Sequence, residues 1–106
     1  MRIIINDYAQ SPHAGEIIAD IMEDLEIGIR ELARALAVAP STASRIVSGA
    51  TAVTPEMAIK LSAVIGSTPA MWLRIQAAYD LERAAKTVDL SVLNTSFKPD
   101  PLQGVN

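Results

Sequence analysis

The sequence predicts an all-α fold, with five helices packed as one domain. The chain has 106 residues, of which 50% are hydrophobic, and this suffices for one compact core but not for two. Four prolines follow a small or capping-type residue and precede a segment with helical spacing, at Ser11-Pro12, Ala39-Pro40, Thr54-Pro55 and Thr68-Pro69. Proline is well placed at a first helical position, because its missing N–H would have no intrahelical partner there. These four pairs therefore indicate helix starts.

Five segments repeat apolar residues with the period of an amphipathic helix. We expect helices at residues 12–25, 29–36, 40–47, 55–65 and 69–86. Gly28 precedes the second segment, while Gly49 and Gly66 follow the third and the fourth, where a left-handed residue commonly ends a helix. The connections are all short, which favours a compact bundle with little room for a catalytic cleft.

The two ends of the chain lack this pattern. Residues 2–5 read RIII, a short β-branched run, and residues 88–93 alternate apolar and polar side chains. Both patterns favour short strands at the termini, or segments that pair with a partner, and we expect residues 98–106 to be disordered without one. The boundaries predicted are an N-terminal arm at 1–11, a helical domain at 12–86 and a C-terminal tail at 87–106.

Composition argues against several classes of function. The chain has no cysteine and one histidine, so disulfides, thiolate zinc sites and cysteine nucleophiles are excluded. His13 lies near Ser11 and Glu16, as a nucleophile–base pair would require, but a histidine beside a helix cap is the better interpretation because nothing supplies an oxyanion hole. We therefore expect no catalytic residue, no metal and no cofactor, and the protein should not be an enzyme.

Charge and hydropathy narrow the expected partners. The net charge of −3 argues against broad, non-specific binding of polyanions, although it leaves room for a local positive patch. No apolar run reaches the length of about 18 residues that a membrane span needs, and the N-terminal apolar stretch is too short for a signal peptide. We therefore expect a cytoplasmic protein with no membrane partner.

Residues 29–49 read IRELARALAVAPSTASRIVSG and hold two short helical segments separated by small residues. A helix-turn-helix unit needs a small residue where its helices touch, a tight turn, and apolar positions that set the crossing angle. Ala33 fits the contact position. The positions expected to be buried are Leu32, Leu36, Val38 and Ile46. The side chains left facing outward on the second helix are Ser41, Thr42, Ser44, Arg45 and Ser48.

This outward face suits a DNA major groove. Short hydroxyls let a helix approach base edges and phosphates, and Arg45 can make a bidentate contact with guanine. Arg30 and Arg34 on the preceding helix can reach phosphates. Residues 28–54 hold three arginines and one acid, Glu31, so this region is positive although the whole chain is acidic. The alternative is a purely structural helical hairpin, which the residue spacing alone leaves open.

From residue 13 to about residue 81 the chain resembles the HigA antitoxins, also called plasmid-maintenance or VapI-type antidote proteins, within the phage-repressor-like helix-turn-helix proteins. The matching stretches are HAGEII at 13–18, RELARAL at 30–36, PSTASRIVSG at 40–49 and TPEMAIKLSAVIGSTPAMWLRIQAAYDL at 54–81. The last stretch is the most specific, because MWLRIQAAYDL directly after a repressor-like unit marks this subfamily. The resemblance implies that residues 12–86 form a five-helix, lambda-repressor-like DNA-binding domain.

The resemblance also implies a function. Proteins of this kind are bacterial homodimeric antitoxins that neutralise a RelE-like, mRNA-cleaving toxin of the HigB type. They repress the shared operon at an inverted-repeat operator, with one recognition helix in the major groove of each half-site, and so are nucleoid-associated when DNA-bound. By position, base-edge contacts fall on Pro40, Ser41, Thr42, Ser44 and Arg45, and phosphate contacts on Arg30, Arg34, Ser48, Thr51 and Thr54. The alternative is a solitary transcriptional repressor without a toxin partner.

Several positions depart from the pattern that many relatives share. Gly28-Ile29 replaces a Ser-Gln pair, so a cap and a phosphate-contacting side chain are both missing. Ala37 replaces a turn glycine, and Ala39 replaces a Ser or Thr cap. Gly49-Ala50-Thr51 stands where relatives often have Gly-Lys-Arg. The lost cations predict weaker and less salt-dependent DNA binding.

Two further groups of residues have more than one interpretation. Trp72 and Tyr79 are seven positions apart on one helix face, which favours the core or a dimer seam over a toxin-facing patch. The first helix carries a run of acids, which favours a solvated face over a cation site or a surface for a basic toxin. These acids are Glu16, Asp20, Glu23 and Asp24. This helix and the two chain ends are the candidates for toxin contact, because a ribonuclease toxin should be basic.

Overall fold

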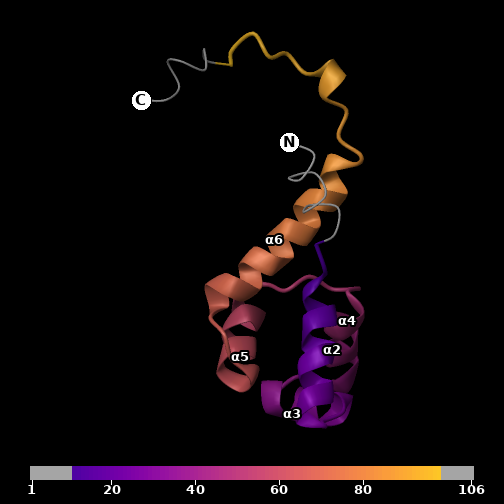
Figure 1. Cartoon of the computed structure of the whole chain (residues 1–106), viewed down its shortest axis with the longest axis vertical. Helices are drawn as coiled ribbons and strands as arrows, with labels where there is room; N and C mark the ends of the chain where they lie inside the picture. Colours follow the sequence, from indigo (N-terminus) through magenta and orange to yellow (C-terminus); the bar gives the residue numbers. More distant parts are fainter. Residues whose placement is uncertain (1–10, 99–106) are drawn as a thin grey trace.

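The computed structural model describes residues 11–98, and within this range the chain forms five α-helices and no strand. The helices are α2 (Ala14–Leu25), α3 (Ile29–Leu36), α4 (Pro40–Ser48), α5 (Pro55–Ile65) and α6 (Pro69–Ala85). Figure 1 shows the first four gathered in a bundle, with α6 packed on it at its start and projecting from it at its end. The all-α, five-helix fold predicted from the sequence is confirmed.

Prolines begin three of the helices, as predicted. Pro40, Pro55 and Pro69 are the first residues of α4, α5 and α6. A threonine precedes each of the last two, and its hydroxyl accepts a backbone N–H bond from the first turn, at 3.2 Å in α5 and 3.1 Å in α6. Ala39 begins α4 without any side-chain cap, so this helix lacks that stabilisation.

α2 begins two residues later than the predicted start at Pro12. Its N-cap is His13, whose backbone is extended (φ −80°, ψ 160°) and whose N–H donates to the Glu16 carboxylate at 3.4 Å. This hydrogen bond joins the N-cap residue to the third residue of the helix, and it fixes Ala14 as the first helical residue. The sequence predicts His13 to lie beside a helix cap, and in the structure it is the N-cap residue itself.

Left-handed residues end three of the helices, and Glu26 is the one that ends α2 (φ 58°). Gly49 ends α4 with φ 84°, as predicted. Ala37 ends α3 in the same region (φ 59°, ψ 44°), where its N–H and that of Val38 donate to carbonyl oxygens of the last turn at 3.2 and 3.0 Å. An alanine Cβ is crowded by a carbonyl oxygen in this conformation, at a cost of about 1 kcal/mol. The turn of the two-helix unit is thus built as a glycine would build it, but under strain.

The core lies where α2, α3, α4 and α5 meet the start of α6. Side chains at most 4% exposed include Ile18, Leu32, Ala33, Leu36, Ala43, Ile46, Val53, Leu61 and Trp72. Four of these were predicted to be buried or in close contact, while Val38, also predicted, is only partly buried. α2 crosses α4 so closely that a Cβ at Gly15 would collide with the carbonyl oxygens of Val47 and Ile46. A glycine is required at this crossing.

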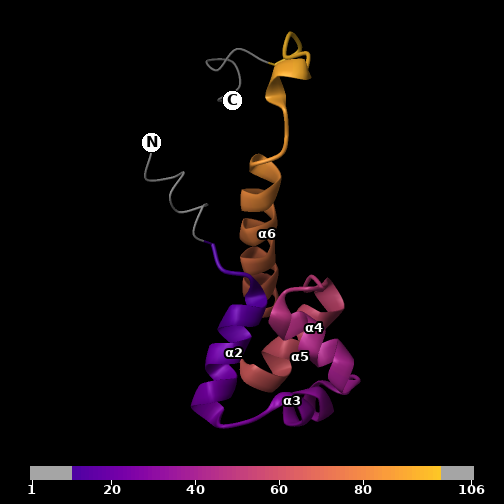
Figure 2. The same ribbon diagram turned by 90° about the vertical axis from the view of Figure 1, so that its right-hand side faces the viewer.

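The segment after α6 does not form the strand predicted at residues 88–93. It continues as irregular chain with a 3₁₀ turn at Leu90–Val92, and Figure 2 shows it running on from the end of α6, away from the bundle. The Asp89 side chain accepts hydrogen bonds from the Ser91 N–H at 3.0 Å and the Ser91 hydroxyl at 2.6 Å, and this closes a turn instead of an extended run. The predictions for residues 2–5 and 99–106 lie outside the described residues.

Ala37→Gly should raise the free energy of unfolding by about 1 kcal/mol, because glycine adopts the left-handed conformation without a steric penalty. Urea denaturation followed by circular dichroism measures the change. The matched control is Ala35→Gly, at an exposed position inside α3, which should lower stability by about 0.5–1 kcal/mol. A destabilising effect of Ala37→Gly would contradict the strain assigned to this turn.

Candidate nucleic-acid interface

α3 and α4 form the two-helix unit predicted at residues 29–49. Ala33 is 1% exposed at the contact between the helices, and the inward faces of Leu32, Leu36 and Ile46 are buried in the core. The inner face of α4 is therefore fixed, and its opposite face must point to solvent. No other element among the described residues covers that outer face.

The outer face of α4 carries hydroxyls and a single cation. Ser41, Ser44, Arg45 and Ser48 are exposed. Pro40 is also exposed at the first turn, and Thr42 is half-buried. The Ser48 hydroxyl donates to the Arg45 carbonyl oxygen at 3.1 Å, but within residues 11–98 no carboxylate pairs with the Arg45 guanidinium. The arginine is thus available to an external acceptor.

Two further arginines lie beside the start of α4. Arg30 and Arg34 are exposed on α3, and no described carboxylate pairs with either. With Ala33, Val38 and Pro40 they line an open hollow of about 280 Å³. The N-terminal N–H groups of α4 lie next to Pro40, so positive charge and helix dipole converge on this hollow.

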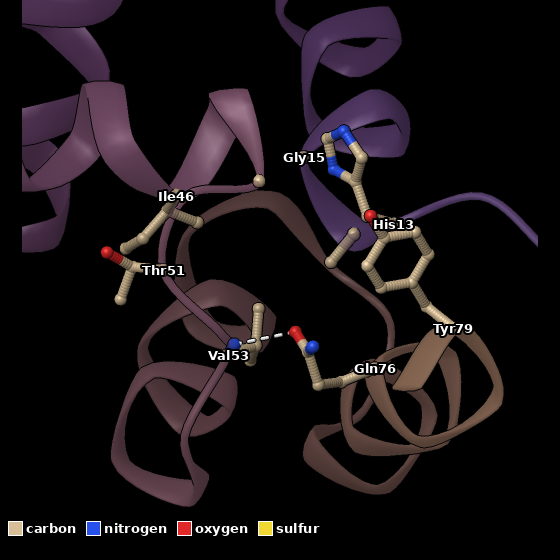
Figure 3. Close-up of a pocket in the computed structure, with 9 residues that line it drawn as sticks. His13, Gly15, Ile46, Thr51, Val53, Gln76 and Tyr79 are labelled. Atoms are coloured by element: carbon tan, nitrogen blue, oxygen red, sulfur yellow. Dashed lines mark hydrogen bonds between the residues drawn. The ribbon is translucent and has the colours of Figure 1, made fainter. Parts of the chain in front are cut away.

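The loop between α4 and α5 carries Thr51 and Thr54, both exposed. Thr54 already uses its hydroxyl to cap α5. The loop is held from the opposite side by Gln76 of α6, whose Oε1 accepts the backbone N–H of Val53 at 2.7 Å, as Figure 3 shows. The Gln76 Nε2 in turn donates to Asp80 at 3.0 Å. The loop's position therefore depends on a side chain of α6 that sequence analysis did not single out.

His13 joins the start of α2 to the end of α4 and to α6. Its ring meets the Tyr79 ring edge-on, with 5.5 Å between centroids, and a Cβ at Gly49 would lie 3.0 Å from three atoms of the imidazole. Its Nε2 lies 3.5 Å from the Glu16 carboxylate, and its Nδ1 is buried with no hydrogen-bond partner. These residues enclose a hollow of only about 10 Å³ (Figure 3), room for roughly one water. Gly49 thus serves both the helix end and this contact.

The two aromatic residues predicted to lie in the core or at a dimer or partner interface, Trp72 and Tyr79, have different environments. Trp72 is 2% exposed, and its indole N–H donates to the Gly66 carbonyl oxygen at 3.0 Å. It belongs to the core of its own chain, which is one of the two places that the residue spacing favours, and a ring so enclosed offers no surface to a second protein. Tyr79 is half-buried, and the Arg83 guanidinium lies 5.4 Å from its ring centroid. It keeps some surface for a partner.

α2 presents the opposite charge to α4. Its exposed residues include four acids and no base, and these acids are Glu16, Asp20, Glu23 and Asp24. Across the described part of the chain, no three histidine or carboxylate side chains are grouped so as to hold a metal ion. None of the described helices is long and apolar enough to cross a membrane.

Comparisons with known proteins agree with this geometry. A family model described as helix-turn-helix matches residues 18–73, from within α2 to the start of α6. A solved structure of an addiction module antidote protein of a HigA family from Coxiella burnetii matches with a TM-score of 0.73 and 30% identity, over 86% of this chain and 97% of that one. The chain belongs to the HigA-type helix-turn-helix family. The resemblance inferred from the sequence is confirmed.

Two curated relatives carry different descriptions. The uncharacterised HTH-type transcriptional regulator YddM of Escherichia coli (strain K12) is 55% identical over 85 residues, or 80% of this chain and 90% of that protein. Antitoxin HigA-1 of Vibrio cholerae is 40% identical over 68 residues, or 63% of this chain and 64% of that protein. The HigA-type chain is thus a helix-turn-helix regulator with antitoxins among its relatives.

Gln76→Ala should lower the free energy of unfolding by about 1–3 kcal/mol, because it leaves the partly buried Val53 N–H without an acceptor. Hydrogen exchange at the Val53 amide should accelerate in the same variant, as NMR would show. Asp80→Ala is the matched control, since it removes only the exposed outer bond of Gln76 and should leave Val53 protected. Equal protection of Val53 in all three proteins would mean that Gln76 does not hold the loop.

Proposed function

We propose that this HigA-type protein is the antitoxin of a type II toxin–antitoxin system. It neutralises a RelE-like, mRNA-cleaving toxin and represses its own operon by binding operator DNA as a dimer. The observation that carries the DNA-binding part is the outer face of α4, where Arg45 stands among serines without a described carboxylate partner. Relatives named as an antitoxin and as an antidote support the toxin-binding part.

In the proposed complex, α4 enters the major groove. Its short side chains at Ser41 and Ser44 let the helix approach base edges, and Thr42 and Pro40 lie on the same approach. Arg45 has the planar fork that reads O6 and N7 of guanine, so it supplies most of the base discrimination. The buried inner face of α4 and the packing of His13 on Gly49 hold the helix in place for this contact.

Phosphate contacts surround this helix. The hollow at Arg30 and Arg34, with the N-terminus of α4 beside it, is suited to one phosphate group. Ser48, Thr51 and Thr54 flank the other end of α4 and offer neutral donors. Two phosphate-facing arginines in each copy make four in a dimer, which corresponds to a salt slope of about −4 in a double-logarithmic plot of affinity against salt concentration. Binding should therefore be only moderately sensitive to salt.

Toxin binding is assigned to a different surface. The exposed acids of α2 attract a basic ribonuclease electrostatically. α2 and α4 pack against each other, so the exposed acids of α2 and the outer face of α4 are separate surfaces of the bundle, one for the toxin and one for the operator. Both ligands are found in the bacterial cytoplasm, where we propose that the protein acts as a binding protein and not as an enzyme.

The second candidate is a solitary operator-binding repressor, favoured by the 55% identity to a protein described only as a transcriptional regulator. Co-expression with the product of a neighbouring small, basic reading frame distinguishes the two candidates. Recovery of a complex together with rescue of growth supports an antitoxin. Binding to its own promoter without any such complex supports the solitary repressor.

Arg45→Ala should weaken binding to the protein's own promoter fragment by about 1–3 kcal/mol, because it removes a bidentate base contact. Fluorescence anisotropy at constant salt measures the affinity. The matched control is Arg83→Ala, which removes the same charge from the far part of α6 and should leave DNA affinity nearly unchanged. Equal affinities for the two variants would contradict the assignment of Arg45.

Asp20→Lys together with Glu23→Lys should weaken toxin capture at least tenfold while preserving promoter binding, since both substitutions reverse charge on α2 alone. Pull-down of the co-expressed toxin and growth rescue provide the readouts. Glu56→Lys, at an exposed position of α5, controls for the loss of an acid elsewhere. Undiminished rescue by the α2 variant would exclude α2 as the toxin-binding surface, and separate deletions of residues 1–7 and 87–106 would then test the chain ends.

A further inference from the structure

Large apolar side chains are exposed along the segment that follows α6. In this C-terminal segment (residues 87–98), Val88 is 55% exposed, Leu90 70%, Val92 75%, Leu93 54% and Phe97 87%. Five of twelve residues are thus large and apolar, whereas a freely solvated tail is poor in such residues. Exposed apolar surface of this extent marks an interaction site.

Four polar side chains of the C-terminal segment form hydrogen bonds within it. Asp89 accepts two hydrogen bonds from Ser91, whose hydroxyl and N–H hold the pKa of the Asp89 carboxyl below its usual value. Asn94 accepts from the Ser96 N–H at 2.9 Å and from its hydroxyl at 2.6 Å. These local turns shape the backbone and leave the apolar side chains pointing to solvent. The segment is therefore preorganised to present an apolar surface.

A matching apolar hollow lies halfway along α6. It has a volume of about 210 Å³ and is lined by Ser11, Pro12, Arg74, Ile75 and Ala78. A cavity of about 150 Å³ accommodates a benzene ring, so this hollow has room for the side chain of a phenylalanine or a leucine. Met71 (41% exposed) and Leu81 (52% exposed) continue the same stripe of α6, at helical spacing from Ile75 and Ala78.

We propose that the C-terminal segment of one copy packs against this stripe of α6 in a second copy, with Phe97 in the hollow, and that the second copy does the same in return. The inference rests on the proposed function, which requires a dimer. In Figures 1 and 2 the segment leaves the end of α6 and runs away from the middle of that helix, so it does not cover its own hollow. If a twofold axis relates the two copies, the C-terminal segment and the α6 stripe of each copy are both covered by the other copy.

The size and charge of the surfaces favour a second copy over the toxin. Each copy contributes the five exposed apolar side chains of its segment and its α6 stripe, and a twofold contact uses both surfaces twice, as a stable interface of roughly 800 Å² per partner requires. The C-terminal segment carries one acid, Asp89, and one base, Lys98, so it has no net charge to attract a basic toxin. The acidic α2 suits that partner better. Contact through this stripe of α6 does not use the outer face of α4, which stays available to DNA.

Two single substitutions, and a mixture of the two variant proteins, test whether each C-terminal segment packs on the other copy. Phe97→Asp and Ala78→Arg should each raise the dimer dissociation constant at least about tenfold in sedimentation equilibrium, because one removes the apolar anchor and the other fills the hollow. Thr95→Asp and Ala77→Arg introduce the same charges at exposed neighbouring positions and should have little effect. Trp72 fluorescence and circular dichroism report whether each variant retains the fold.

Mixing the Phe97→Asp and Ala78→Arg proteins should restore dimers. In the mixed pair, one contact joins opposite charges and the other keeps the natural phenylalanine and alanine. A contact within one chain could not be restored by mixing. The proposal is overturned if the two variants dimerise as the natural chain does, if mixing restores nothing, or if Phe97→Asp abolishes toxin capture while the dimer persists.

Promoter binding by the natural chain separates this proposal from the proposed function. A natural dimer that is sensitive to Phe97→Asp but does not bind the promoter would uphold the interface and overturn the DNA-binding proposal. A dimer that binds the promoter but is insensitive to Phe97→Asp would overturn the interface and uphold the DNA-binding proposal.

Discussion

The structure depends on the backbone-to-backbone crossing of α2 and α4 at Gly15. No side chain fits there, because a Cβ would meet the carbonyl oxygens at the end of α4. The close approach brings Ile18 and Ile46 into one core and lays His13 over Gly49. Since protein interiors are close-packed, α4 cannot rotate without opening this contact. The side of α4 that faces solvent is therefore decided by a residue on another helix.

The sequence predicts the helices well because their start and end signals are local. Prolines begin α4, α5 and α6, and the apolar spacing around Ala33 identifies the buried face of the two-helix unit. Once the buried face is known, the remaining residues of α4 must face outward. Local signals fail where a more specific bond intervenes, as with the Glu16 carboxylate that sets the start of α2 and the Asp89 side chain that turns residues 88–93 away from a strand.

Long-range contacts have no comparable signature in the sequence. Gln76 and Val53 are 23 positions apart, and a glutamine on a mixed helix face gives no sign that it will accept a loop N–H. Trp72 illustrates a related problem, because an aromatic at helical spacing fits a core and an interface equally well. Only the enclosure of its ring and its bond to Gly66 distinguish the two. The sequence thus predicts which types of residue form the candidate site, but it does not predict the long-range contacts that hold them in position.

α6 is a rod of 17 residues, about 25 Å long, with its base fixed and its far end outside the bundle. Trp72 fixes the base, while Gln76 and Tyr79 connect the next turns to the loop after α4 and to His13. A tilt of about 5° at the base would displace the far end by about 2 Å, as follows from that length. Conversely, a partner that binds the far end of α6 acts on the DNA-facing loop, because the rigid helix transmits the displacement along its whole length. Mechanically, the helix that bears no DNA-contacting residue is the one best placed to adjust those that do.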